Sequence, residues 1–456
     1  MRRIVFSGFP LLILASTAAC GDTSQAETLA GQDAGEEAAI TPDAGAEAGV
    51  DAPGDDAEKT QPDASTSDAA DDAPQEEDSG VCPPLDDPQW TIETVDADPG
   101  FKARVALALD PAQRVRLAYN RATSGDGWED FELRVAEHAA QGWKIETVVA
   151  SDGLSNEYPT IVVDNQGVSH VVFNRYVPSE NQIDMFVVSG TIGAGFSTPV
   201  NLTQTQGTDE YGGSVAIGPD GVLHVVHIQR TPIPDEPGKY TYDTGYVAYD
   251  GAPKDAEVIG TGTLMFTGSP EQSISVDPAG RVHVAYLRPG EKPSHGVAHY
   301  RKRDPVGWSA ETMVTSNQAN ATGISIAAAA DRVHFAYGKG TVDVTMTHRL
   351  LDAAGLGPET ALTSSVDDRA YYLGLQAVGT DGVYVAFRRI VDGNADVFFV
   401  SGEQGTFASE EPVTQTADED ELVASLAVGR CGEAYVAFLE NFSTAPDGRV
   451  MVATRR

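Results

Sequence analysis

A pattern of two apolar runs joined by a turn occurs seven times along this chain, and it constrains the fold more than any other feature. In each copy the turn contains Asp, Gly or Pro, which predicts a β-hairpin. The second runs end between 50 and 59 residues apart, at Tyr119, Phe173, His227, Tyr286, Tyr337, Phe387 and Phe438. Self-similarity at such a period indicates a repeat architecture.

Each hairpin is followed by a variable loop and a third apolar segment, such as FELRVAEH from Phe131. Six copies also have a fourth segment, most clearly those that start at Trp143 and Trp308. Four strands per copy, repeated seven times, match a seven-bladed β-propeller. The first run of each copy is rich in Ala, Ser and Gly, as expected where seven sheets converge on one axis. We therefore expect an all-β fold over residues 86–456.

The two ends of the repeat region complement one another. The seventh copy ends with RVMVATRR and lacks a fourth segment, whereas Trp90-Thr-Ile-Glu-Thr-Val, before the first copy, nearly repeats the segment at Trp143. We expect the N-terminal strand to complete the last blade and to close the ring. The alternative is an open array, which would leave an unpaired strand edge at each end.

The first twenty residues resemble a bacterial lipoprotein signal. Arg2 and Arg3 precede a short apolar stretch, and small residues then lead into Cys20. The apolar stretch is too short to span a bilayer as a helix. The resemblance implies that Cys20 is lipidated, and Gly21 after it implies an outer-membrane or cell-surface location. The alternative is an ordinary secretory signal, residues 1–20, with a coincidental cysteine.

Residues 21–85 are expected to form a disordered acidic linker. Residues 21–80 carry 18 Asp or Glu and one Lys, and almost no large apolar residue. Such a segment cannot bury enough apolar area to offset the entropy of ordering, and its like charges extend it. Of the net charge of −38, −23 remains on residues 81–456. This argues against nucleic acid and anionic membrane surfaces as partners. We expect a monomer whose membrane contact is its lipid anchor.

Two further cysteines test the propeller topology. Cys431 lies in the turn between the first two strands of the last copy, and Cys82 lies just before the strand that completes it. In an up-and-down blade both positions fall on the same rim. We therefore predict a Cys82–Cys431 disulfide, which an oxidising compartment permits. Two separate thiols are the alternative, because topology alone does not fix the distance.

The repeat pattern of apolar run, Asp, Gly and His-Val-Ala-Tyr resembles the propellers related to sialidases and to some lectins. The resemblance covers residues 90–456 and implies an architecture. The Asp-box pattern Ser-x-Asp-x-Gly-x-x-Trp is not matched, and Ser275-Val-Asp277-Pro-Ala-Gly280 comes nearest. No catalytic residue is carried over, because a fold alone does not confer an activity.

Histidines recur at one position, three residues before the end of the second strand, at His170, His224, His283 and His334. Because they belong to different copies, we expect a repeated structural hydrogen bond and not a shared metal site. The acidic loops at Ser124 and Asp392 lack a complete Ca²⁺ ligand series. We expect neither a metal nor a cofactor.

Cations follow the second strand of the first six copies, at Arg121, Arg175, Arg230, Arg288, Lys339, Arg388 and Arg389. Such a ring could hold a carboxylated sugar or another anion. In three copies an acidic residue stands beside the cation and predicts a rim salt bridge worth little energy: Glu157 with Arg175, Glu210 with Arg230, and Glu271 with Arg288.

The last copies carry further charged and aromatic residues that take no part in these predicted salt bridges. They form a candidate ligand site of Arg369, Tyr371, Tyr372, Arg388, Arg389, Glu421 and Glu440. A polar cleft with both charges and aromatic faces suits a sugar, and cross-blade ion pairing is the competing interpretation. We expect a non-catalytic binding or scaffold module for a glycan or protein. The alternative is a polysaccharide-acting enzyme, either a hydrolase that uses Glu421 and Glu440 or a lyase that uses a Tyr beside an Arg.

Overall fold

The computed structural model describes residues 89–456, apart from residues 99, 101, 124–129, 264–271, 292–295, 341–343, 364–370, 379–381, 392, 404, 417–420 and 442–447. The chain divides into two units, Met1–Val81 and Cys82–Arg456, and the described residues all belong to the second. Cys20, Cys82, Arg369 and Glu271 therefore lie outside the described residues, as do the segments predicted to be a signal peptide and a linker, residues 1–20 and 21–85. The described residues contain no helix long and apolar enough to cross a membrane.

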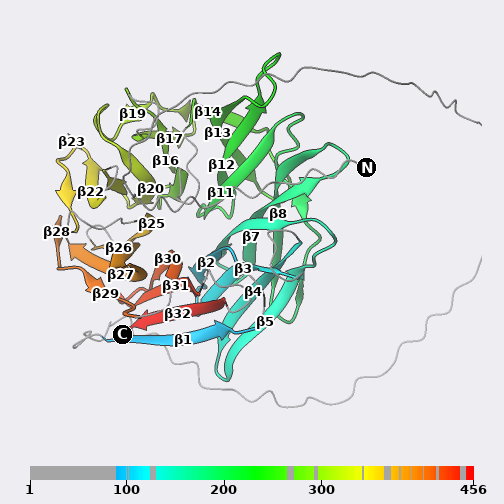
Figure 1. Ribbon diagram of the computed structural model, residues 1–456. Coiled ribbons are helices and arrows are strands. Elements are labelled where there is room, and N and C mark those ends of the chain that lie inside the picture. The colour runs from blue at the N-terminus through cyan, green and yellow to red at the C-terminus, as the bar shows by residue number, and fades with distance from the viewer. Residues whose placement is uncertain are drawn as a thin grey trace, which may run out of the picture. The chain divides into compact units, whose positions relative to one another are not determined.

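Antiparallel meanders build the described unit (Figure 1). The first has the order β2 (Val105–Leu109), β3 (Val115–Ala122), β4 (Phe131–Ala139) and β5 (Gly142–Val149). The second consists of β6 (Asn156–Val163), β7 (Ser169–Val177) and β8 (Gln182–Thr191), with β9 (Gly195–Phe196) and β10 (Val200–Asn201) both paired to β8. The third has the order β11 (Asp209–Ile217), β12 (Leu223–Pro232), β13 (Tyr240–Tyr249) and β14 (Glu257–Thr261).

Two further separate sheets come from the C-terminal part of the chain. One consists of β25 (Tyr371–Val378), β26 (Gly382–Val391) and β27 (Asn394–Glu403), with β28 (Thr406–Phe407) and β29 (Glu411–Pro412) paired to β27. The other combines the two ends of the unit, in the order β1 (Trp90–Asp96), β32 (Arg449–Arg455), β31 (Ala434–Glu440) and β30 (Glu421–Val428).

The remaining strands form one ten-stranded sheet, so the expectation of seven separate sheets was wrong: five are separate. Its first half is β15 (Gln272–Val276), β16 (Val282–Pro289), β17 (Gly296–Asp304), β18 (Gly307–Trp308) and β19 (Thr312–Met313). Its second half is β20 (Ala321–Ala328), β21 (Val333–Lys339), β22 (Thr345–Asp352), β23 (Gly355–Leu356) and β24 (Thr360–Ala361). A single residue pair, Gly296 with Ala321, joins β17 to β20. Glycine permits this join, because a Cβ at residue 296 would overlap the Ala321 carbonyl oxygen.

The seven predicted hairpins are confirmed. The repeated residues at which the sequence pattern ended each second run lie inside the second strands and are at most 1% exposed, namely Tyr119, Phe173, His227, Tyr286, Tyr337, Phe387 and Phe438. Burying a large apolar side chain contributes roughly 1.5–3 kcal/mol. The hydrophobic clusters take residues from neighbouring hairpins, as where Leu107 of β2 and Leu439 of β31 belong to one cluster. Strands thus pair mainly within a repeat, whereas the hydrophobic clusters pack neighbouring repeats against one another.

The first strand of each hairpin is an inner strand, and the inner strands contact one another in chain order. They are β2, β6, β11, β15, β20, β25 and β30, and β30 contacts β2 again, which closes a ring. Small side chains allow neighbouring inner strands to lie close together. Serines also connect them, since a serine hydroxyl of one inner strand accepts a hydrogen bond from a backbone N–H of the next. The Ser273 hydroxyl accepts from the Ile326 N–H at 3.2 Å, and the Ser425 hydroxyl accepts from the Leu107 N–H at 3.0 Å. The described unit is an all-β propeller.

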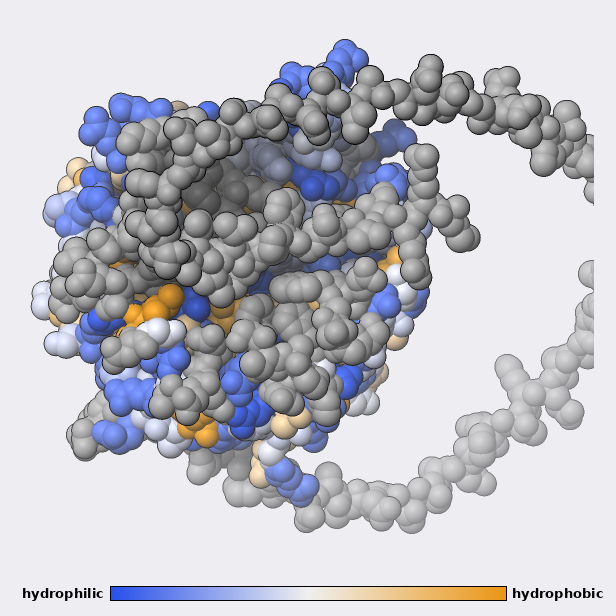
Figure 2. All heavy atoms as spheres, viewed as in Figure 1, coloured by the Kyte–Doolittle hydropathy of each residue, from blue (hydrophilic) through white to orange (hydrophobic). Residues whose placement is uncertain are grey.

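The predicted closure by the N-terminal strand is confirmed. β1 pairs antiparallel with β32, from Trp90 with Arg455 to Asp96 with Val450, with an irregularity between Thr94 and Asp96. The Trp90 ring meets Phe399 of the neighbouring sheet edge-on, with ring centroids 5.3 Å apart. On the face drawn in Figure 2, the coloured surface is mainly hydrophilic and apolar residues show only in small separate areas.

Candidate functional site

The loop rim consists of the connections from second to third strands together with the segments that lead into the inner strands. Its cations are engaged in ion pairs. Arg121 pairs with Glu132 at 3.1 Å, Arg230 with Asp209 at 2.6 Å and Arg288 with Glu311 at 2.8 Å. The remaining rim pairs are Arg175 with Asp152, Lys339 with Glu359, and Arg389 with Glu410.

Two of the three predicted rim salt bridges therefore have the wrong acidic partner, and Glu271, the predicted partner of Arg288, lies outside the described residues. Arg175 pairs with Asp152 and not with Glu157, Arg230 pairs with Asp209 and not with Glu210, and Arg288 pairs with Glu311. The cause is the strand geometry at the rim. β6 and β11 have an irregular register directly after Glu157 and near Glu210, and Glu210 is completely buried. Sequence proximity cannot show which of two adjacent carboxylates faces out of such a bulge.

One repeat position at the rim carries a buried polar residue in four repeats. This position lies four residues before the inner-strand residue that pairs with Ala118, Val172, Val226 or Ala437 of the second strand. In the same order, it is occupied by Lys102, Asn156, Glu210 and Glu421. None of the four is more than 1% exposed. We call this the latch position.

Latch residues contact the start of the preceding repeat's third strand. The Lys102 ammonium donates to the Gly448 carbonyl oxygen at 2.9 Å, just before β32, and the Asn156 amide donates to the Phe131 carbonyl oxygen at 2.7 Å, in β4. Glu210 lies beside Asp184 of β8, and Glu421 lies beside Asp396 of β27, as their electrostatic interactions show. The latch position thus connects one repeat to the next.

Glu421, a candidate ligand-binding and acid–base residue, has the same surroundings as Glu210. Threonine hydroxyls donate to both: Thr416 to Glu421 at 2.7 Å, and Thr205 and Thr203 to Glu210. Burial raises the pKa of Glu210 to about 9, and the nearby Asp184 carboxylate adds to the shift while Thr205 opposes it. Burial likewise raises the pKa of Glu421 to about 8, with Asp396 and Glu440 adding to the shift. Both carboxyls are therefore mainly protonated at neutral pH.

The backbone brings several predicted site residues together. Glu421 pairs directly opposite Glu440, Tyr371 pairs opposite Arg388, and Arg388 Nε donates to the Glu421 carbonyl oxygen at 3.1 Å. Tyr372 lies at the irregularity of β25 between Tyr371 and Leu373.

The charged members of this group interact mainly within the protein. Glu440 pairs with Arg449 at 2.6 Å, and Arg389 pairs with Glu410. The guanidinium carbon of Arg389 also lies 5.2 Å from the Phe398 ring centroid. Each of these ion pairs lies within one repeat, so these charges are paired, as the competing interpretation expects, but within a blade and not across blades.

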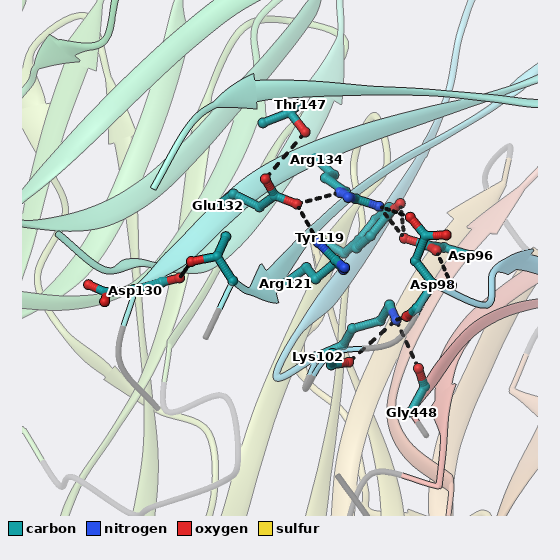
Figure 3. A network of polar contacts seen from close by, with 12 residues as sticks. Asp96, Asp98, Lys102, Tyr119, Arg121, Asp130, Glu132, Arg134, Thr147 and Gly448 are labelled. Carbon is teal, nitrogen blue, oxygen red and sulfur yellow. Dashed lines mark hydrogen bonds and ion pairs between the residues drawn. The ribbon is translucent and has the colours of Figure 1, made fainter. Parts of the chain in front are cut away.

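A second polar network ties the closing strand to the first repeat (Figure 3). Asp96 accepts from the Tyr119 hydroxyl at 2.7 Å and from Arg134 at 3.0 Å. Arg134 also pairs with Asp98 at 3.0 Å and with Glu132 at 2.7 Å. Each of these three carboxylates has a cationic partner, so the network stabilises the closure of the ring.

The repeated histidines form within-blade hydrogen bonds, as predicted. In each, Nδ1 lies near a polar atom of the adjacent third strand: Ser189 at 2.8 Å, Tyr246 at 2.7 Å, Tyr300 at 2.8 Å and His348 at 3.1 Å, for His170, His224, His283 and His334 in that order. Among the described residues, no group of three or more His, Cys, Asp or Glu is arranged to hold a metal ion.

The sequence reasoning missed two stacks of arginine on tyrosine at the rim. The Arg230 guanidinium carbon lies 4.9 Å from the Tyr211 ring centroid and 4.6 Å from that of Tyr240. The Arg104 guanidinium carbon lies 5.0 Å from the Tyr158 ring centroid. A signal was present, because Tyr158 occupies a repeat position that holds Gly212 and Gly323 in two other copies.

No protein-family model matches this sequence, and no curated protein is significantly similar to it. Among solved structures the chain is similar to an ulvan lyase of polysaccharide lyase family PL25, with a TM-score of 0.57 and 10% identity over 79% of this chain and 95% of that chain. The same kind of lyase bound to -[GlcA(1-4)Rha3S]- gives a TM-score of 0.57 at 11% identity over the same shares. A Hadza microbial sialidase gives a TM-score of 0.45 at 12% identity, over 78% of this chain and 65% of that chain. At these identities the likeness concerns the fold alone.

Proposed function

We propose that this protein is an exported, lipid-anchored propeller that binds an acidic glycan on its loop rim without catalysing a reaction on it. Two observations support the ligand class. The rim carries arginines and tyrosines, the side chains that recognise carboxylates and sugar faces. A lyase of the same fold is bound to a glucuronate-containing polysaccharide.

The observation that carries the non-catalytic proposal is the recurrence of the Glu421 environment at Glu210. Each glutamate is completely buried, accepts from threonine hydroxyls and lies beside an aspartate of the preceding third strand. A general acid must reach the substrate. A side chain with no exposed surface, repeated in a second copy, serves the connection between repeats instead. Glu440, the proposed second carboxylate, is paired with Arg449.

A polysaccharide lyase or hydrolase is the second candidate, favoured by the similarity to the ulvan lyase. One experiment separates the two functions. The full-length protein is incubated with acidic polysaccharides, and both binding and chain shortening are measured. We expect binding without cleavage. Cleavage that is lost in Glu421→Gln would establish the enzyme, and absence of binding to every acidic polysaccharide would refute the proposal. Arg389→Ala should weaken binding if the ligand contacts the rim at Tyr371, Tyr372 and Arg388.

We also propose a ring of seven blades. The ten-stranded sheet would hold two of them, β15–β19 and β20–β24, since each half has the same strand order as the separate sheets. The closed series of inner-strand contacts supports this count.

Lipidation of Cys20 and an outer-membrane or cell-surface location complete the proposal. The signal-like first twenty residues support it. A Cys20→Ala variant should lose the acyl group in a mass measurement and move from the membrane fraction to the soluble fraction. Retention of the variant in membranes would contradict the anchor.

A further inference from the structure

The Arg230 stack spans three adjacent strands. Tyr211 comes from β11, Arg230 from β12 and Tyr240 from β13. Asp209 accepts from Arg230 Nη2 at 2.6 Å and from Nε at 3.2 Å, so it holds the edge of the guanidinium. The guanidinium carbon lies over both tyrosine rings, 4.9 Å from the Tyr211 centroid and 4.6 Å from the Tyr240 centroid. Tyr240 is 36% exposed, so it presents an aromatic surface to solvent.

The Arg104–Tyr158 stack lies at the start of two neighbouring inner strands. Tyr158 has a φ of +51°, whereas the equivalent Gly212 and Gly323 have φ values of +59° and +63°. A tyrosine in this left-handed conformation costs roughly 1–2 kcal/mol relative to glycine. Two other repeats build the same bulge with glycine, so the fold does not require tyrosine there. Because the fold does not require the backbone strain at Tyr158, that strain indicates a function for the tyrosine side chain.

The two stacks form one row. Glu157 interacts electrostatically with both Arg104 and Tyr211. β2 contacts β6, and β6 contacts β11. The row therefore runs from Arg104 and Tyr158, at the inner strands, outward through Tyr211 and Arg230 to Tyr240.

The two arginines of the row are the groups that would receive an anion, and Asp209 holds one edge of Arg230. Each guanidinium group is presented beside an aromatic face. Burial raises the pKa of Glu157, and the Ser155 hydroxyl and the charge of Arg104 oppose this shift. A guanidinium binds carboxylate and sulfate groups with two parallel hydrogen bonds, and tyrosine faces pack against the C–H faces of sugar rings.

We propose that the row Arg104–Tyr158–Tyr211–Arg230–Tyr240 is a binding site for an oligosaccharide that carries anionic groups, with sugar rings on Tyr158 and Tyr240 and anions at the arginines. The proposal rests on the proposed glycan-binding function and adds a site on a different part of the repeat series from Arg389. The anion is either a uronate carboxylate or a sulfate ester, since both present the same chemistry to arginine.

Titration calorimetry on the full-length protein tests the site. The probes are oligogalacturonate, a sulfated malto-oligosaccharide and the unsulfated malto-oligosaccharide, matched in length. Tyr158→Gly and Tyr240→Ala should each weaken binding of an anionic probe about ten-fold or more, as for an aromatic anchor in an interface. The control is Val306→Ala, at a residue that is 95% exposed in the β17–β18 turn, away from the loop rim.

Tyr158→Gly separates a binding role from a structural one. Because glycine relieves the left-handed strain, the variant should unfold at the same temperature as the wild type or higher, while it loses affinity. If the wild type binds an anionic probe and both variants bind it equally well, the row is not the site, although the glycan-binding function stands. If the wild type binds none of the anionic probes, the proposed function itself fails. Equal affinity for the unsulfated probe would refute the anionic ligand class. If the wild type binds one anionic probe in preference to the other, the anionic group of that probe, carboxylate or sulfate, is the group that the site recognises.

Discussion

The Lys102 ammonium donates a hydrogen bond to the carbonyl oxygen of Gly448 at 2.9 Å, across 346 positions of the chain. A second bond reaches the Asp98 carbonyl oxygen at 2.7 Å. Lys102 is 1% exposed, and burial lowers its pKa, an effect that the Asp96 carboxylate opposes. The lysine joins the segment after the N-terminal strand to the start of the C-terminal strand, so it holds the ring closed at the same place as the β1–β32 pairing.

Replacing Lys102 with methionine should therefore destabilise the propeller. Methionine keeps most of the apolar stem but leaves buried carbonyl oxygens without their donor, at a cost of about 2–4 kcal/mol. Urea unfolding monitored by tryptophan fluorescence measures the loss. Lys144→Met, at an exposed lysine of β5, is the matched control and should change stability little. Equal midpoints for the two variants would show that Lys102 does not hold the closure.

The sequence predicted the hairpins and the closing strand because both follow from patterns that repeat. Trp90–Val95 nearly repeats the Trp143 segment, and the seventh copy is the one that lacks a fourth segment, so the N-terminal strand has one position in which to pair. The latch position was missed, although it also repeats, because a lysine, an asparagine and two glutamates, Lys102, Asn156, Glu210 and Glu421, share a position and a burial but form no single residue pattern. The partner of Arg230 was misassigned for a related reason, since a bulge decides whether Asp209 or Glu210 faces it.

Gly296 gives a direct test of the join within the ten-stranded sheet. A Cβ at this position would overlap the Ala321 carbonyl oxygen, so Gly296→Ala must push β17 away from β20. We expect a loss of about 1–3 kcal/mol, typical of overpacking in a filled interior. Gly448→Ala is the control, because the nearest atom to a Cβ at residue 448 would be 3.8 Å away. Thermal unfolding compares the two, and a Gly296→Ala variant as stable as Gly448→Ala would contradict the close approach.

The Cys82–Cys431 disulfide remains a prediction, because Cys82 lies outside the described residues. Cys431 stands in the turn between β30 and β31, where its N–H donates to Glu433 at 3.2 Å. A bond to Cys82 would fix the chain just before β1 to the sheet that β1 completes. Chain-entropy reasoning gives at most about 5 kcal/mol for so long a loop.

Non-reducing peptide mapping should recover one cross-linked peptide that contains both cysteines. Reduction, or Cys431→Ala, should lower the midpoint of urea unfolding. Free thiols at both positions in protein secreted to an oxidising compartment would refute the bond.

Stability should fall as pH rises above the ordinary range of a glutamate, because of Glu210 and Glu421. Their pKa values are raised in the folded protein, to about 9 and about 8, from an ordinary 4.5. Below pH 4.5 both the folded and unfolded states hold these protons, and this contribution is fully present. Between pH 4.5 and the raised pKa, only the folded state holds them. The free energy of unfolding therefore decreases by up to about 1.4 kcal/mol per pH unit for each group.

Glutamine mimics the protonated acid at every pH, so Glu210→Gln and Glu421→Gln should each flatten this dependence. Urea unfolding at several pH values between about 5 and 8 measures the slope, which linkage equates with the difference in bound protons. Relative to the wild type, each variant should gain stability as pH rises, and the double variant should gain the most. Glu403→Gln, at an exposed glutamate where β27 ends, should run parallel to the wild type. If the Glu210→Gln and Glu421→Gln curves also run parallel to the wild type, neither carboxyl holds a proton in the folded protein. Glu421 would then be charged at neutral pH.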